Sequence, residues 1–214
     1  MLTAYAYHFY PTNTNQVFLG TSRIWIVGSS IIKRAATCAF TRPGGLNLNL
    51  HDTSIWWQGY SGMKLQDLVP KLRSLLRYED PPTYLIIHCG ANNVGQTPIE
   101  RLVQILINTL LEICALFPAS SIVWSSSLPR FSWRFSSNVK AMNQARARMD
   151  REAIRFLSVR GGHHIKHTQF NVKPPHLYHG DGVHLSQLGN DLLLNNYQGA
   201  IQYFMDGGGI GFPA

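Results

Sequence analysis

Short apolar runs alternate along this chain with longer segments in which apolar residues recur three and four positions apart. The four clearest runs are rich in isoleucine, valine and tryptophan and cover 24–28, 54–58, 84–88 and 121–125. Runs of this length and composition are typical of buried β-strands. A fifth strand is predicted near 164–167, after the Gly161-Gly162 pair.

The segments between these runs predict helices. The first follows Gly28, and either Ser29 or Ser30 can cap it. Four more are predicted, over 65–76, 98–116, 138–157 and 186–203. Strands that alternate with helices of this length predict an α/β fold, with a mostly parallel, five-stranded sheet in a three-layer α/β/α arrangement.

A single domain is expected over 21–206. The chain has 214 residues, of which 45% are hydrophobic and 14% charged, and this balance is typical of a globular protein rather than a disordered one. Residues 1–20 show no periodicity and are expected to form a loosely ordered arm. The Gly-rich end, 207–214, is expected to be a flexible tail.

Several features bear on where the protein is located. No run of 18 or more apolar residues occurs, so no membrane span is predicted, and segment 1–20 lacks the pattern of a secretory signal. The three cysteines have apolar neighbours and no metal-ligand spacing, which indicates buried free thiols in a reducing compartment; they are Cys38, Cys89 and Cys114. An intracellular location, cytoplasmic or nuclear, is therefore expected.

The positive charge is concentrated in one part of the chain. Segment 130–173 holds ten Lys or Arg and two acids, and so carries the whole net charge of +8. Within it, Arg148, Arg151 and Arg155 share one face of the predicted helix 138–157. This face fits a nucleic-acid contact, and it also fits a plain solvated surface.

Candidate chemistry lies in four turns. Three of them follow strands, Gly28-Ser29-Ser30, 59–62 and 90–93, and the fourth, 181–184, precedes the last helix. Parallel sheets place such turns along one carboxyl edge, where ligand sites form. Together the turns hold a hydroxyl, a carboxamide, a glycine N–H, a carboxylate and an imidazole, the groups that acyl transfer uses.

The four turns resemble the motifs of the SGNH hydrolases, also called GDSL-type esterases and lipases. Gly28-Ser29-Ser30 is similar to their Gly-Asp-Ser motif, and Gly62 matches the glycine of the second motif. Gly90-Ala-Asn92-Asn93 is similar to Gly-x-Asn-Asp, and the segment from Asp181 to His184 is similar to Asp-x-x-His. The resemblance covers about 22–204 and implies the flavodoxin-like fold of that family. A narrower likeness is to SGNH-type domains of animal retroelement-derived proteins.

The resemblance also implies a role for each residue. Ser30 would be the nucleophile, His184 the general base, and Asp181 the group that orients the imidazole. The backbone N–H groups of Ser30 and Gly62 and the side chain of Asn92 would form the oxyanion hole. Taken singly, Gly62 also fits a strand break, Asn92 a turn cap and His184 a helix cap.

Two positions depart from the family pattern, and both concern acidic residues. Ser29 replaces the acid of Gly-Asp-Ser, and Asn93 replaces the acid that follows the oxyanion-hole asparagine. Neither position is in the triad. The expected function is therefore hydrolysis of an acyl ester, acetyl, short-acyl or lipid, by a Ser-His-Asp triad. The alternative is a catalytically weak accessory module of a retroelement that binds nucleic acid through the basic helix.

No cofactor and no metal site are expected. Five histidines occur in a basic, Gly- and Pro-rich region without cysteine partners: His163, His164, His167, His176 and His179. This composition does not match the ligand spacing of a zinc site.

Overall fold

The computed structural model describes residues 21–214, so the predicted arm 1–20 lies outside the described residues. Six strands form one parallel sheet in the order β2-β1-β3-β4-β5-β6. The strands are β1 (Ser22–Gly28), β2 (Thr53–Gly59), β3 (Tyr84–His88), β4 (Ser121–Ser125), β5 (His163–Ile165) and β6 (Gly211–Phe212). Because every pair is parallel, the carboxyl ends of all strands meet at one edge.

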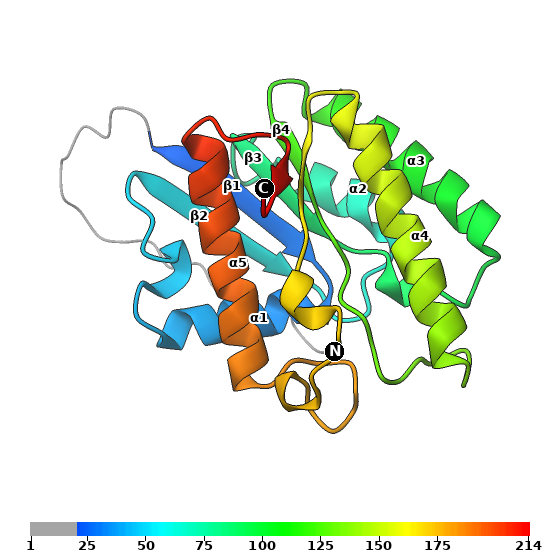
Figure 1. The fold of residues 1–214 in the computed structure, drawn as a ribbon. Helices are drawn as coiled ribbons and strands as arrows, with labels where there is room; N and C mark the ends of the chain where they lie inside the picture. Colours follow the sequence, from blue (N-terminus) through cyan, green and yellow to red (C-terminus); the bar gives the residue numbers. More distant parts are fainter. Residues whose placement is uncertain (1–20) are drawn as a thin grey trace, which may run out of the picture.

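Five helices cover the two faces of this sheet (Figure 1). On one face lie α1 (Ser30–Thr41) and α5 (Gln187–Met205), whose apolar residues pack with Ile24 and Ile26 of β1. On the other lie α2 (Leu65–Leu75), α3 (Ile99–Leu116) and α4 (Val139–Ser158), packed against Trp25 and Val27. Alternate residues of β1 thus enter opposite cores, as the period of two in a strand requires. The predicted three-layer α/β/α fold is confirmed.

The turn from β1 into α1 depends on close packing at Gly28. A Cβ atom there would lie 2.3 Å from the carbonyl oxygen of His88 and 2.6 Å from Ile32. Only glycine therefore lets β1 end beside β3 while the chain turns directly into α1. Ser29 is the N-cap residue and is 5% exposed, and α1 begins at Ser30.

The sheet has one strand more than the five predicted from the sequence. The sixth, β6, lies in segment 207–214, which was expected to be a flexible tail, and it pairs with β5 through His164↔Gly211 and Ile165↔Phe212. A strand of two residues is too short to show hydrophobic periodicity. It is held by two backbone hydrogen bonds, His164 N–H to the Ile210 carbonyl and Lys166 N–H to the Phe212 carbonyl, and by packing of Phe212 against Tyr203. The fifth strand also begins slightly earlier than expected, at His163.

Two further expectations concern the cysteines and membrane-spanning segments. All three cysteines are free; Cys38 and Cys89 are buried, whereas Cys114, expected to be buried, is partly exposed. Within the described part of the chain, no helix is both long enough and apolar enough to cross a membrane.

Candidate active site

The carboxyl edge of the sheet brings together Ser30, His184 and Asp181. Ser30 Oγ lies 2.9 Å from His184 Nε2, across 154 positions of sequence. His184 Nδ1 lies 2.6 Å from Asp181 Oδ2. A carboxylate can only accept, so Nδ1 carries the proton and Nε2 is left to accept from the serine hydroxyl. The three side chains form an unbroken hydrogen-bonded chain.

A tight turn before α5 sets the positions of Asp181 and His184. Asp181 Oδ1 accepts the backbone N–H groups of Val183 and His184, both at 2.9 Å. The His179 N–H donates to the His184 carbonyl, which closes the turn. Desolvation raises the pKa of Asp181, but the hydrogen bonds from His184 and Val183 outweigh it and hold the pKa well below its usual range. Asp181 is therefore ionised throughout the neutral range.

Ser30 lines a cleft of about 450 Å³. Its walls are Ser30 and His184, the turn Ser61-Gly62, and the α1 residues Lys33, Arg34 and Thr37. The backbone N–H groups of Ser30 and Gly62 donate to no other group among residues 21–214. Ser30 is also the first residue of α1, so its N–H lies at the positive end of the helix dipole. Both N–H groups are thus free to donate to a ligand in the cleft.

Asn92 lies beside the second of these donors. Its Nδ2 donates to the carbonyl of Met63, the residue after Gly62, at 3.0 Å. One of the two Nδ2 hydrogens remains for a ligand. The positive φ of Gly90 (99°), where a Cβ would meet Met149 at 2.7 Å, shapes the short turn Ala91–Asn93 that holds Asn92.

The two departures from the family motifs are accommodated differently. Asn93 is 1% exposed; its Oδ1 accepts the Leu65 N–H at the start of α2 (2.9 Å), and its Nδ2 donates to Gln66 (2.8 Å). The carboxamide therefore accepts the helix N–H as a carboxylate would. Ser29 is buried and makes no side-chain cap hydrogen bond, so its side chain contributes no polar contact to the turn Gly28-Ser29-Ser30.

A further side chain of the site, Arg130, was counted in the sequence only as part of the basic segment. It follows β4, and its Nη2 donates to Asn92 Oδ1 at 3.2 Å. The next residue, Phe131, donates its N–H to the Gly182 carbonyl, so this loop also abuts the turn that carries Asp181. The rule that polar residues after parallel strands gather at one edge applies to Arg130 too, and could have identified it.

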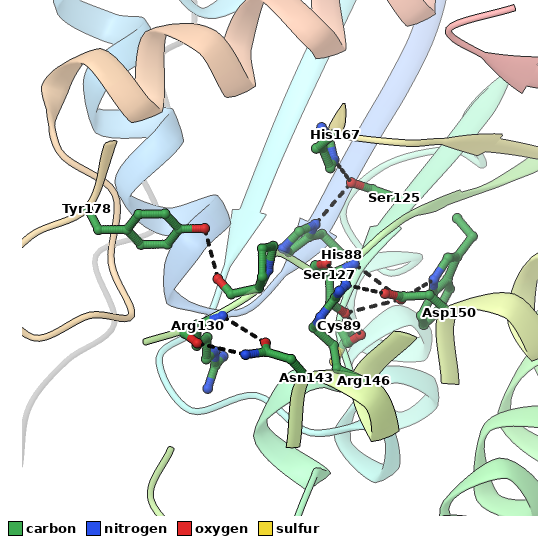
Figure 2. A network of polar contacts seen from close by, with 12 residues as sticks. His88, Cys89, Ser125, Ser127, Arg130, Asn143, Arg146, Asp150, His167 and Tyr178 are labelled. Carbon is green, nitrogen blue, oxygen red and sulfur yellow. Dashed lines mark hydrogen bonds and ion pairs between the residues drawn. The ribbon is translucent and has the colours of Figure 1, made fainter. Parts of the chain in front are cut away.

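The loop that carries Arg130 is fixed along its length (Figure 2). Asn143 of α4 accepts the Arg130 N–H (3.0 Å) and donates to the Arg130 carbonyl (2.9 Å). The Tyr178 hydroxyl donates to the Pro129 carbonyl at 2.8 Å. Asp150, which is buried and paired with Arg146 at 3.0 Å, accepts the Ser127 N–H. These contacts fix the backbone of the loop on both sides of the Arg130 side chain, which itself contacts Asn92 and Trp133.

Arg130 keeps a charge with no acidic partner. Within residues 21–214 no carboxylate forms an ion pair with it, and its guanidinium lies 5.0 Å from the centre of the Trp133 ring. Burial lowers the pKa of Arg130 to about 10, an effect that the nearby Asp181 opposes. The guanidinium is therefore charged at neutral pH. Keeping a desolvated cation without an ion pair costs stability, which is more typical of functional sites than of structural ones.

A buried polar cluster surrounds Ser125 (Figure 2). Ser125 Oγ contacts His88 Nδ1 (3.0 Å), His167 Nε2 (2.8 Å) and the Tyr197 hydroxyl (2.9 Å). The His88 carbonyl accepts the Ser29 N–H, which links the cluster to the turn Gly28-Ser29-Ser30. Burial, followed by the charges of Arg130 and Arg146, lowers the pKa of His88 to about 3. Its ring is therefore neutral at physiological pH.

The predicted nucleic-acid contacts lie apart from this site, on α4. Arg148 forms an ion pair with Glu100 of α3 (2.9 Å), and Arg155 with Glu152 (2.6 Å). Of the three arginines, only Arg151 has no acidic partner among the described residues. The count of charged residues in segment 130–173 did not include Glu100, because Glu100 lies outside that segment. No group of three or more metal-ligating side chains occurs in the described range.

Comparison with known proteins identifies the fold. No protein-family model matches the sequence, and neither does any curated protein. Among solved structures, a member of the lipolytic G-D-S-L family from Veillonella parvula matches with a TM-score of 0.65, at 12% identity over 84% of this chain and 98% of its own. A lipase/acylhydrolase from Enterococcus faecalis matches with a TM-score of 0.64, at 16% identity over 84% and 95%. A catalytic mutant of an acetylxylan esterase from Geobacillus stearothermophilus gives 0.62, at 14% over 86% and 96%. The chain therefore has the SGNH hydrolase fold.

Proposed function

We propose that this chain is a carboxylic-ester hydrolase with Ser30 as its nucleophile. The observation that carries the proposal is the hydrogen-bonded chain from Ser30 through His184 to Asp181, which opens into a cleft. The solved structures of the same fold, described as lipolytic, esterase and acylhydrolase proteins, support it. The acyl group is acetyl or another short acyl chain, or that of a lipid ester.

The proposed reaction uses the three side chains in turn. Ser30 Oγ attacks the ester carbonyl while His184 Nε2 takes its proton, and ionised Asp181 stabilises the imidazolium that forms. The tetrahedral intermediate collapses, the ester C–O bond breaks, and His184 returns the proton to the leaving alcohol. Water then attacks the acyl-serine by the same route in reverse, releasing the acid. These steps require no cofactor.

The negative charge of the intermediate is stabilised by donors that are already in position. The free N–H groups of Ser30 and Gly62 and the Asn92 amide would bind the oxyanion, and each such donor is typically worth about 3–4 kcal/mol in the transition state. Arg130 acts through Asn92: its hydrogen bond to Oδ1 fixes which way the amide points and strengthens the opposite N–H as a donor.

Paired serine substitutions test this proposal. Purified protein should hydrolyse p-nitrophenyl acetate, and Ser30→Ala should lower kcat by about 10³-fold or more. Ser29→Ala is the matched control, since the neighbouring hydroxyl makes no side-chain cap contact, and it should keep most of the rate. Equal rates for the wild type and Ser30→Ala would contradict the proposal. Loss of activity on Ser29→Ala alone would show that the nucleophile had been assigned one residue too late.

A further inference from the structure

The face of α1 that carries Ser30 also carries two cations. Ser30, Lys33, Arg34 and Thr37 are spaced three, four and seven positions apart, which places them on one side of the helix. All four line the same cleft, together with His184. Lys33 and Arg34 therefore lie in the wall beside the nucleophile.

No residue in the described range 21–214 neutralises these two charges. Both side chains are exposed, and neither forms an ion pair or a hydrogen bond with any residue of 21–214. Among the described residues, the cleft lining contains no Asp or Glu. Lys33 and Arg34 are the fourth and fifth residues of α1, which has no acidic residue in its first turn, so they add to the positive end of the helix dipole. Cations near that end are disfavoured, and an anionic ligand would offset the cost.

The position of His184 indicates which part of an ester would meet these cations. The base returns its proton to the leaving alcohol, so the alcohol must lie on the His184 side of the scissile bond. His184 lines the cleft with Lys33 and Arg34, whereas the neighbouring pocket across the Ser61-Gly62 turn lacks it. That second pocket, of about 450 Å³, has both apolar and polar lining residues, among them Tyr60, Met63, Asp67 and Lys71, and it would receive the acyl group.

We propose that the preferred substrates are esters whose alcohol part carries an anionic group, a carboxylate or a phosphate, bound by Lys33 and Arg34. Hydrolysis splits the ester C–O bond, with water supplying the oxygen of the acid, and releases the anionic alcohol after His184 protonates its oxygen. The inference rests on the proposed ester hydrolysis. It adds that the substrate is anionic and that its anionic group lies on the alcohol side of the scissile bond.

Three acetyl esters with a common acyl group test the proposal. They are p-acetoxybenzoate and p-acetoxyphenyl phosphate, which are anionic, and p-acetoxybenzamide, which is neutral; each rate is divided by the ester's hydroxide-catalysed rate. Two exposed ion-pair contacts should make kcat/KM roughly tenfold higher for an anionic ester than for the amide at low ionic strength. Raising NaCl from about 20 mM to about 500 mM should reduce this preference, because salt screens exposed charges.

The double variant Lys33→Gln/Arg34→Gln identifies the residues responsible. It should bring the ratio of anionic to neutral kcat/KM close to one. The control is Arg73→Gln/Arg77→Gln, which removes the same charge from exposed positions in the last turn of α2 and just beyond it, and it should keep the wild-type ratio. If the carboxylate and phosphate esters differ, the better one identifies the anionic group.

Two results would overturn the inference. One is turnover of the neutral ester with no preference for either anionic ester, which would leave the proposed hydrolase function standing. The other is a preference that the Lys33→Gln/Arg34→Gln variant retains, which would assign it to other residues. Absence of turnover of all three esters would overturn both the inference and the proposed function.

Discussion

Replacing Arg130 with methionine should slow catalysis without unfolding the protein. The change removes the hydrogen bond from Arg130 Nη2 to Asn92 Oδ1 but keeps a side chain of similar length over Trp133. A hydrogen bond that involves a charged group is worth about 1.5–3 kcal/mol, and the 3.2 Å distance favours the lower end of that range. If the bond matters mainly for aligning the oxyanion donor, kcat should fall by about 10–30-fold.

The effect should appear in kcat rather than in KM, because a neutral ester gains from the Asn92 amide only as the oxyanion forms. p-Nitrophenyl acetate is therefore the substrate to use. Arg130→Lys, which keeps the charge but lacks the planar guanidinium, should recover part of the rate. Arg134→Met is the matched control: Arg134 is exposed, and its guanidinium lies 5.8 Å from the Phe135 ring.

Urea unfolding separates a positioning role from a structural one. Loss of the hydrogen bond is offset by removal of a desolvated charge, so the free energy of unfolding of Arg130→Met should stay within about 1 kcal/mol of the wild type. An unchanged kcat would refute the positioning role. A fall in kcat that simply followed a large loss of stability would refute it equally.

Three more predictions follow from other parts of the structure. Asp181→Asn keeps a similar shape but no longer stabilises the imidazolium or fixes the tautomer of His184, so kcat should fall by a factor on the order of 10³–10⁴, and an unchanged rate would exclude the triad. His88 has a folded-state pKa of about 3 against an ordinary value of 6.5, so its contribution to stability is complete above pH 6.5 and is lost as the pH falls towards 3. Lowering the pH from about 7.5 to about 5 should reduce the free energy of unfolding, measured with urea, by about 2 kcal/mol because of His88. The variant His88→Gln should not show this reduction. Nucleic-acid binding stays a prediction. In a filter-binding assay with single strands, Arg151→Gln should reduce the slope of log affinity against log salt concentration by about 0.7. Absence of any salt-dependent binding would contradict the prediction.

The sequence predicted those parts of the site that depend on local pattern and chain topology. Strand ends and their turns could be read from apolar runs and glycines, and a parallel sheet then places Ser30, Gly62 and Asn92 at one edge. The triad distances support the register that the motifs implied for Asp181 and His184.

The features that the sequence missed depend on tertiary contacts. The strand-end rule places Arg130 at the carboxyl edge, but its contact with Asn92 also depends on Asn143 and Tyr178, which are distant in sequence and hold its loop. Strand β6 forms through backbone bonds to β5 and packing of Phe212 against Tyr203, and two residues are too few to show a strand pattern. The charge of Arg148 is opposed by Glu100 from another helix, which a count along one segment could not include.

Covalent labelling tests the central claim, that Ser30 is an activated nucleophile, most directly. The protein would be treated with diethyl p-nitrophenyl phosphate, digested with trypsin, and the peptide that ends at Lys33 fragmented in a mass spectrometer; this peptide contains both Ser29 and Ser30. The account predicts a single diethylphosphoryl adduct on Ser30, absent in Ser30→Ala and formed far more slowly in His184→Ala. No adduct, or an adduct on Ser29 or on a serine elsewhere, would contradict it.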